Sequence, residues 1–226
     1  GLYRPHTPYV APKKYFDLYE TDDMEIPKSS NEYLKTIPQA AARSVREKRD
    51  QRNLEENLAK TIKEAYYATT SFVDAQVGRV LDKLEETGLD KNTIVVFTSD
   101  HGYHLGEHGH WQKQTLFDNA TRIPLIISFP NMKNKGGISK SPVELIDLYP
   151  TLMDLTGINI PEHVVGKSLE PLMKNLKASV RGSALTRWRK GYSIKTKRFR
   201  LTKWGSNGEL GYELYDHKND KKELIN

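Results

Sequence analysis

A long helical periodicity, followed by a short apolar run, constrains the fold of this chain more than any other feature. Between residues 54 and 84, apolar side chains recur at steps of three and four residues, as in a helix that buries one face. Gly88 follows, where a glycine in the left-handed conformation commonly ends a helix. The sequence therefore predicts one long helix that ends before Gly88.

Two strand-length runs of β-branched and apolar residues come next, at residues 93–98 and 124–129. A helix followed by a fully apolar strand is typical of α/β folds, in which helices cover both faces of a parallel sheet. We therefore expect both runs to be buried strands of a parallel central sheet flanked by helices. Asp147 is expected to cap a further helix, with Pro150 in its first turn and Gly157 after its end.

The two ends of the chain have different patterns. Residues 1–53 carry several prolines and no sustained period, which favours loops and short helices. After Pro171, short runs alternate between polar and apolar residues, as antiparallel strands do. We expect residues 1–172 to be the C-terminal portion of an α/β domain, and residues 173–226 to be a small α+β subdomain with an antiparallel sheet.

Composition narrows the function only slightly. The formal net charge of +6 favours an anionic partner, but charge alone does not separate nucleic acid, a membrane surface and an acidic small substrate. The densest basic run, residues 187–200, alternates with aromatic and β-branched residues, which favours a solvated strand face over a binding patch. The absence of cysteine excludes disulfides and thiolate metal sites in this chain. No apolar run approaches the roughly 18 residues of a membrane-spanning helix.

Most residues with chemical potential lie in residues 98–113, directly after the first predicted strand. In open α/β sheets, the loops at the carboxyl ends of strands form the ligand crevice. Asp100 and His101 are adjacent there, and a carboxylate oxygen with an imidazole nitrogen suits a divalent cation, while Gly102 lets the backbone turn behind them. Two ligands do not complete a site, so at least two more must come from elsewhere.

Other interpretations of this segment stay open. An isolated Asp-His pair is more often a helix cap beside a surface histidine. Four histidines within ten residues, interleaved with glycines, favour a functional role instead. Spacing alone leaves open a zinc site made only of histidines, namely His101, His104, His108 and His110.

Several motifs resemble the type I sulfatases of the alkaline phosphatase superfamily. The central ones are Thr98-Ser-Asp-His-Gly, Leu105-Gly-Glu-His-Gly, Trp111 with Lys113, and Arg122-Ile-Pro-Leu-Ile. The helical Asp74-Ala-Gln-Val-Gly-Arg, and Glu213-Leu-Tyr-Asp with Asp220 and Glu223, are similar to further family motifs. Among sulfatases the chain is most similar to iduronate-2-sulfatases, which share the opening from Gly1 to His6 and a Gly-Tyr-Ser-Ile near residue 191.

The resemblance implies an alkaline-phosphatase-like fold and hydrolysis of sulfate esters, specifically a 2-O-sulfate on a uronic acid or related sugar of a sulfated polysaccharide. It assigns Asp100 and His101 to the second pair of metal ligands. The ion is usually calcium, although most sulfatases have asparagine where this chain has His101. It matches Lys113 to a lysine that holds a sulfate oxygen and His6 to a histidine beside the sulfate or leaving group. Without the resemblance, an ordinary loop lysine and a packed histidine would be the simpler interpretations.

Further substrate contacts are expected from His110, Arg187 and Trp188, although support of the fold is the more ordinary role for the last two. The family's nucleophile is a formylglycine made in a Cys/Ser-x-Pro-x-Arg motif. Nothing in this chain matches that motif, since the nearest segment, Ser128-Phe-Pro-Asn-Met, lacks the arginine. We therefore expect the nucleophile, the first metal pair and any targeting signal in a missing N-terminal half, and this chain alone to be inactive.

The resemblance also implies a sulfated carbohydrate as substrate, with no nucleic acid or membrane partner, and a periplasmic, secreted or, in a eukaryote, lysosomal location. Two alternatives remain. One is a phosphodiesterase or phosphonate monoester hydrolase of the same superfamily, which also uses the Asp-His pair. The other is a catalytically inactive, carbohydrate-binding relative, which has no need of Asp100, His101 and Lys113.

Overall fold

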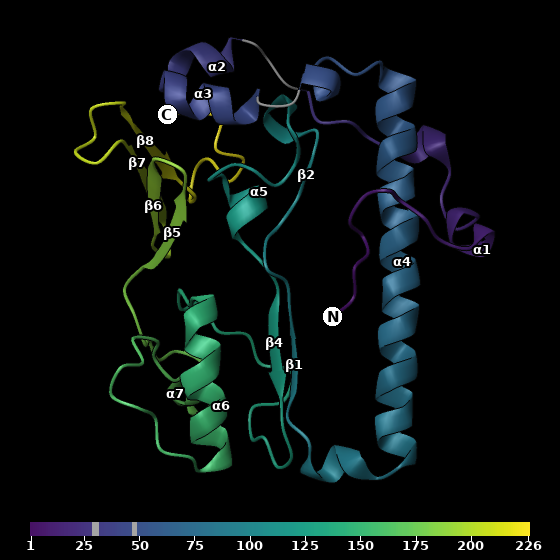
Figure 1. Ribbon diagram of the computed structural model, residues 1–226, viewed down its shortest axis with the longest axis vertical. Coiled ribbons are helices and arrows are strands. Elements are labelled where there is room, and N and C mark those ends of the chain that lie inside the picture. Colours follow the sequence, from purple (N-terminus) through teal and green to yellow (C-terminus); the bar gives the residue numbers. More distant parts are fainter. Residues whose placement is uncertain (29–31, 47–48) are drawn as a thin grey trace.

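The computed structural model describes residues 1–28, 32–46 and 49–226 (Figure 1). The first part of the chain consists of loops and short helices, as expected, although residues 29–31 and 47–48 lie outside the described range. These helices are α1 (Lys13–Phe16), η1 (Thr21–Asp23), α2 (Tyr33–Thr36), α3 (Gln39–Val45) and η2 (Arg49–Gln51). None of the helices in the described part is both long enough and apolar enough to cross a lipid bilayer.

The long helix predicted from periodicity is α4 (Glu56–Glu86). At its start, the Glu55 carboxylate accepts hydrogen bonds from the backbone N–H groups of Asn57 and Leu58, both at 3.1 Å. At its end, Gly88 has a φ of 69°, the left-handed conformation that the sequence predicted. A short helix, η3 (Leu89–Asn92), then leads into the first strand.

The two apolar runs form β1 (Val95–Thr98) and β4 (Leu125–Ser128), but the prediction of buried parallel strands is wrong for this pair. The strands are antiparallel, with Val95 opposite Ser128 and Thr98 opposite Leu125. After β1 the chain passes through four short elements and then enters β4 beside the end at which it left β1. These elements are β2 (His104–Leu105), η4 (Glu107–Gly109), β3 (Trp111–Gln112) and α5 (Asp118–Thr121). An apolar run indicates burial but says nothing of strand direction, which depends on this connection.

Helices lie on both sides of the β1/β4 pair (Figure 1). On one side, Leu169 and residues of α7 (Glu170–Lys174) form a core with Leu125 and Ile127 of β4. Asp147 stands at the N-cap position of α6 (Leu148–Thr156), but its carboxylate does not cap that helix. It accepts hydrogen bonds from the N–H groups of Glu144 and Lys167, both at 2.8 Å, and pairs with Arg181. Gly157 ends α6 in the left-handed conformation, as predicted.

The C-terminal antiparallel sheet is confirmed. Its order is β5 (Ala184–Trp188), β6 (Gly191–Lys195), β7 (Phe199–Trp204) and β8 (Tyr212–Asp216). The expectation that residues 187–200 form a solvated face is wrong for Arg200, which is 1% exposed. The same face of the sheet also buries Thr202, Glu213 and Tyr215.

The opposite face of this sheet is apolar and exposed. One row runs across all four strands, because consecutive members are paired in register: Leu185, Ile194, Leu201 and Leu214. Exposed apolar patches of this kind usually pack against another segment or molecule. The buried face of the sheet is polar instead, and its interactions within the chain are described below.

One core joins three distant parts of the sequence. Ile37, Ala41 and Val45 come from the α2–α3 region, and Leu116 and Phe117 follow β3. Trp204 and Tyr215 come from the C-terminal sheet and complete the cluster. The segment with the Asp-His and Gly-Glu-His-Gly motifs is therefore anchored to both ends of the chain. The predicted boundary between residues 172 and 173 stays a prediction.

Candidate active site

Asp100 and His101 leave β1 with their side chains directed at one another. The Nδ1 of His101 lies 2.8 Å from the carbonyl oxygen of Gly102, and a carbonyl can only accept, so Nδ1 carries the hydrogen. The lone pair on Nε2 is then free, and Nε2 lies 3.6 Å from the Asp100 carboxylate. The side chain of Asp100 is 85% exposed and that of His101 is 32% exposed, so both can be reached from solvent.

This geometry fits two neighbouring ligands of one divalent cation. Two atoms that each lie about 2.3–2.5 Å from a calcium ion, at roughly a right angle, are separated by about 3.5 Å. The hydrogen bond from Nδ1 to Gly102 also fixes the ring and its tautomer, as it commonly does for metal-binding histidines. The pair is therefore compatible with one shared divalent cation, and the assignment of Asp100 and His101 as metal ligands stays a prediction.

Helix α5 holds this loop from behind. The N–H of Gly102 donates to the carbonyl oxygen of Ala120 at 2.8 Å. A Cβ at position 102 would lie 2.0 Å from the carbonyl oxygen of Asn119, so only glycine fits. The hydroxyl of Ser99 donates to the His101 carbonyl at 2.7 Å and tightens the turn further.

Three tyrosines connect this loop to α4 and to the N-terminal segment, a link that the sequence did not reveal. The hydroxyls of Tyr9 and Tyr103 lie 2.5 Å apart, and the rings of Tyr66 and Tyr103 are 4.9 Å apart. Burial raises the pKa of Tyr66 to about 12 and that of Tyr103 above its ordinary value, so both stay neutral. The cluster therefore ties the N-terminal segment that contains Tyr9 to residues 99–103, the loop that carries Asp100 and His101.

His6 belongs to that N-terminal segment. It is exposed, its ring lies 4.9 Å from that of Tyr3, and its Nδ1 donates to the Thr7 carbonyl at 2.8 Å. Lys113 follows β3 and is half-buried, and its ammonium makes no ion pair within the described residues. The structure thus brings Asp100 and His101 together, whereas His6 and Lys113 make no direct contact with them in the described part.

The remaining motif histidines are packed into the interior. His104 Nε2 lies 2.8 Å from the Thr115 hydroxyl, and His110 Nδ1 lies 2.9 Å from the Val45 carbonyl. Among the described residues, no three of His101, His104, His108 and His110 gather at one point, so the structure does not support a zinc site made only of histidines. His110 is buried, and the substrate-binding role expected for it stays a prediction.

His108 is the most unusual of these histidines. It is 5% exposed, has a φ of 57°, and stacks on Phe117 at 3.9 Å between centroids. Neither ring nitrogen has a hydrogen-bond partner within the described residues. Burial lowers the pKa of His108 to about 4, so the ring is neutral at physiological pH.

A second group of possible ligands is Asp118, His217 and Glu223. The ammonium of Lys195 already lies between two of them, 2.9 Å from the Asp118 carboxylate and in contact with His217 Nδ1. His217 Nε2 lies 2.6 Å from the Glu223 carboxylate. A protein cation supplies the positive charge here, which argues against a metal site.

Glu223 and Arg200 form the centre of the buried polar face of the C-terminal sheet. Arg200 Nε donates to Glu223 at 2.5 Å, and its guanidinium lies over the rings of Phe117 and Tyr215, at 5.1 and 4.7 Å from their centroids. Burial alone raises the pKa of Glu223, but the hydrogen bond from His217 and the charge of Arg200 outweigh it and lower the pKa to about 2. Sequence reasoning had marked Glu223 only as part of a C-terminal motif.

Arg187 and Trp188, predicted to contact substrate, lie on β5. Arg187 is exposed and lies over the ring of Tyr192, at 5.2 Å from its centroid. Trp188 packs against the core cluster that contains Trp204 and Tyr215. This placement favours a structural role for Trp188, and the substrate contacts of both residues stay a prediction.

Comparison with known proteins identifies relatives of the whole chain. The sulfatase family model matches residues 1–158, and the model described as N-sulphoglucosamine sulphohydrolase, C-terminal, matches residues 106–226. A sulfatase from Formosa agariphila is 35% identical over all of this chain and 45% of its own length. The iduronate 2-sulfatase of Mus musculus is 31% identical over 71% of this chain and 36% of its own length.

Solved structures give the same fold. A phosphonate monoester hydrolase from Silicibacter pomeroyi is 27% identical, with a TM-score of 0.84 over 96% of this chain and 49% of that one. The fold is thus the alkaline-phosphatase-like fold of sulfatases, here with a four-stranded antiparallel sheet at the C-terminus. The chain spans less than half the length of each of these three proteins.

Proposed function

This chain belongs to the sulfatase family, and we propose that it contributes the second half of an active site that hydrolyses sulfate esters of carbohydrates. The observation that carries the proposal is the convergence of Asp100 and His101, with 3.6 Å between their ligand atoms. The match of the family model over residues 1–158 supports it independently.

In this proposal Asp100 and His101 supply a carboxylate oxygen and a ring nitrogen to a divalent cation, most commonly calcium in this family. Bound there, the cation would polarise a sulfate oxygen and offset its charge. Lys113 supplies an ammonium to a second sulfate oxygen, where a fixed positive charge stabilises the transition state. His6 would contact the sulfate or the leaving-group side of the substrate.

The proposal assigns the remaining catalytic groups to residues other than these 226. None of these 226 residues stands in a Cys/Ser-x-Pro-x-Arg motif, which is where the family forms its formylglycine. We therefore propose that this chain alone has no sulfatase activity. The other metal ligands and the nucleophile would come from a segment equivalent to the part of the relatives that this chain does not cover.

The proposed substrate is a 2-O-sulfated uronic acid, or a related sugar, within a sulfated polysaccharide. The likeness to an iduronate 2-sulfatase, at 31% identity over 71% of the chain, supports this choice. A phosphonate monoester hydrolase is the alternative, because one such enzyme has this fold at 27% identity. An inactive carbohydrate-binding relative is less consistent with the accessible ligand atoms of Asp100 and His101.

The test is product release by the full-length protein carrying its formylglycine. Inorganic sulfate is measured with 2-O-sulfated uronic acid oligosaccharides, beside 6-O-sulfated glucosamine, a phosphate diester and a phosphonate monoester, each with and without a chelator. Chelator-sensitive sulfate release from the uronic acid substrate is expected. Phosphonate hydrolysis without sulfate release would replace the proposal with the alternative, and release of sulfate by the 226-residue chain alone would contradict its predicted inactivity.

A further inference from the structure

Four arginines at three-residue intervals line one hollow on the surface of α3 and η2. The hollow has a volume of about 440 Å³, and we call it the arginine hollow. Its lining residues are Gln39, Ala42, Arg43, Arg46, Arg49 and Arg52. The sequence analysis did not single out this set of arginines.

Three of these arginines lack a counter-charge. Within the described residues, Arg43, Arg49 and Arg52 form no ion pair or hydrogen bond through their side chains, and all three are exposed. Asp50, between Arg49 and Arg52, forms no ion pair with either of them in the described part, and the Glu55 carboxylate is bound to the start of α4. Like charges held close together repel one another, so an anion bound among them gains more than it would at a single arginine.

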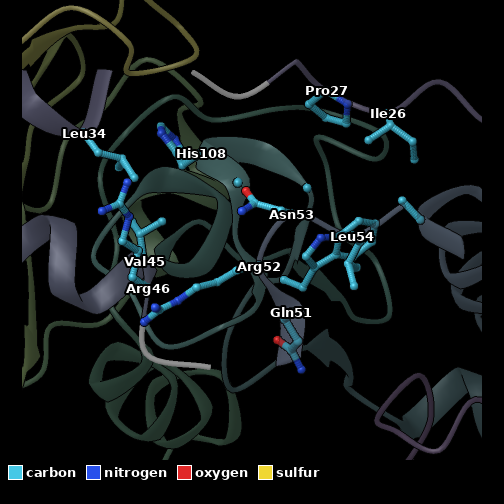
Figure 2. A pocket seen from close by; sticks show the side chains of 14 residues that line it. Ile26, Pro27, Leu34, Val45, Arg46, Gln51, Arg52, Asn53, Leu54 and His108 are labelled. Carbon is cyan, nitrogen blue, oxygen red and sulfur yellow. The ribbon is translucent and has the colours of Figure 1, made fainter. Parts of the chain in front are cut away.

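The arginine hollow adjoins the motif segment. Arg46 and Arg52 also line a second pocket of about 360 Å³, whose wall includes Gly106, Gly109 and Trp111 of the Gly-Glu-His-Gly-His-Trp motif. In Figure 2 the side chain of Arg52 extends toward the side of this pocket where Val45 and Arg46 lie. The two hollows therefore share a cationic wall that begins at the motif and continues along α3.

We propose that the arginine hollow binds anionic groups of a sulfated carbohydrate chain, at sugar units other than the one that is hydrolysed. The proposal rests on the proposed function, because it assigns a second contact to the same class of substrate. Guanidinium groups suit this role, since their fixed fork of N–H donors matches the oxygens of tetrahedral and carboxylate anions.

The lining of the arginine hollow favours a carbohydrate over a nucleic acid. Proteins that hold single-stranded nucleic acid combine a basic groove with aromatic side chains on which the bases stack. The arginine hollow contains no aromatic residue among its lining side chains in the described part. A chain of sulfated sugars needs no stacking surface and presents its charges outward.

The experiment uses the full-length protein and the triple variant Arg43→Gln, Arg49→Gln and Arg52→Gln. Its matched control removes three exposed positive charges elsewhere, with Lys133→Gln, Lys135→Gln and Lys140→Gln. The dissociation constant of a sulfated glycosaminoglycan octasaccharide is measured by calorimetry at low salt, beside its desulfated form and a single-stranded DNA octamer. Thermal unfolding of both variants checks that they fold.

We expect the arginine variant to bind the sulfated octasaccharide at least about fivefold more weakly, since three exposed ion pairs are lost. The lysine variant should change by less than about twofold, and the ratio of kcat/KM for octasaccharide to monosaccharide should fall only in the arginine variant. Equal weakening in both variants would overturn the proposal, as would DNA binding as tight as that of the sulfated octasaccharide. With a chelator present during calorimetry, binding is measured without turnover, so loss of octasaccharide affinity in the arginine variant would support the hollow even if no sulfate were released.

Discussion

The carboxylate of Glu223 accepts a hydrogen bond of 2.8 Å from the backbone N–H of Asp118, 105 residues earlier in the chain. Asp118 is the first residue of α5, and the carbonyl of Ala120 in that helix accepts the hydrogen bond from Gly102 beside His101. Two hydrogen bonds, one at each side of α5, thus connect the C-terminal segment to the loop that carries Asp100 and His101. Glu223 of the C-terminal motif thus helps to hold α5 in place.

Replacing Glu223 by Gln should destabilise the protein by about 3 kcal/mol or more, because it leaves the buried Arg200 without its counter-charge. Urea unfolding measures the change. The control is Asp17→Asn, which breaks an exposed ion pair with Lys13 and should cost less than about 1 kcal/mol. Similar losses of unfolding free energy in both variants would show that the buried Arg200–Glu223 pair contributes no more to stability than an exposed one.

The same carboxylate predicts a loss of stability in acid. The folded-state pKa of Glu223 is about 2, below the ordinary value of 4.5, so the folded state holds the ionised form more strongly than the unfolded state does. Its contribution is complete above about pH 4.5 and declines as the pH falls toward 2. Unfolding free energies measured across this range should fall less steeply in Glu223→Gln than in the unchanged protein, and parallel curves would contradict the assignment.

His108 predicts a second pH effect, at higher pH. Its folded-state pKa of about 4 lies below the ordinary 6.5, so only the unfolded state takes up the proton between these values. Stability should therefore fall as the pH drops from about 6.5 to 4. His108→Phe, which keeps an aromatic ring against Phe117, should reduce this slope, whereas the exposed control His163→Phe should leave it unchanged. A slope unaffected by His108→Phe would refute the explanation.

Gly102→Ala should disturb the loop that carries Asp100 and His101, because the added Cβ would lie 2.0 Å from the Asn119 carbonyl oxygen. We expect a loss of stability of more than about 2 kcal/mol and weaker calcium binding in the full-length protein. Gly78→Ala is the matched control, since a Cβ at that position in α4 meets nothing within 4 Å. It should be neutral or stabilising by up to about 1 kcal/mol. Equal behaviour of the two variants would exclude a role for the contact with α5.

Local patterns in the sequence predicted those parts of the fold that depend on local interactions. The periodicity of α4, its terminal Gly88 and the alternation in β5–β8 each reflect the geometry of a single element. The direction of β1 relative to β4 could not be predicted, because it depends on the path of the chain between them. An apolar strand predicts burial but not the direction of its neighbouring strand.

The candidate site was predicted to a similar extent. Asp100 and His101 are neighbours in sequence, so their convergence followed from the strand exit alone. The buried Arg200 could not be foreseen, because an arginine in an alternating strand normally faces water, and Glu223 lies 23 residues away. The contact between Tyr9 and Tyr103 spans 94 residues and has no local signal either.

The most direct test of the central claim is calcium binding and sulfate release by the full-length, formylglycine-containing protein with Asp100→Asn or His101→Ala. Calorimetry should show calcium affinity reduced at least about tenfold in each variant, and sulfate release should fall in parallel and recover partly at high calcium concentration. Lys14→Gln, at an exposed position, serves as control. Unchanged calcium affinity in both variants would contradict the assignment of Asp100 and His101 as metal ligands and remove the main support for the proposed active site.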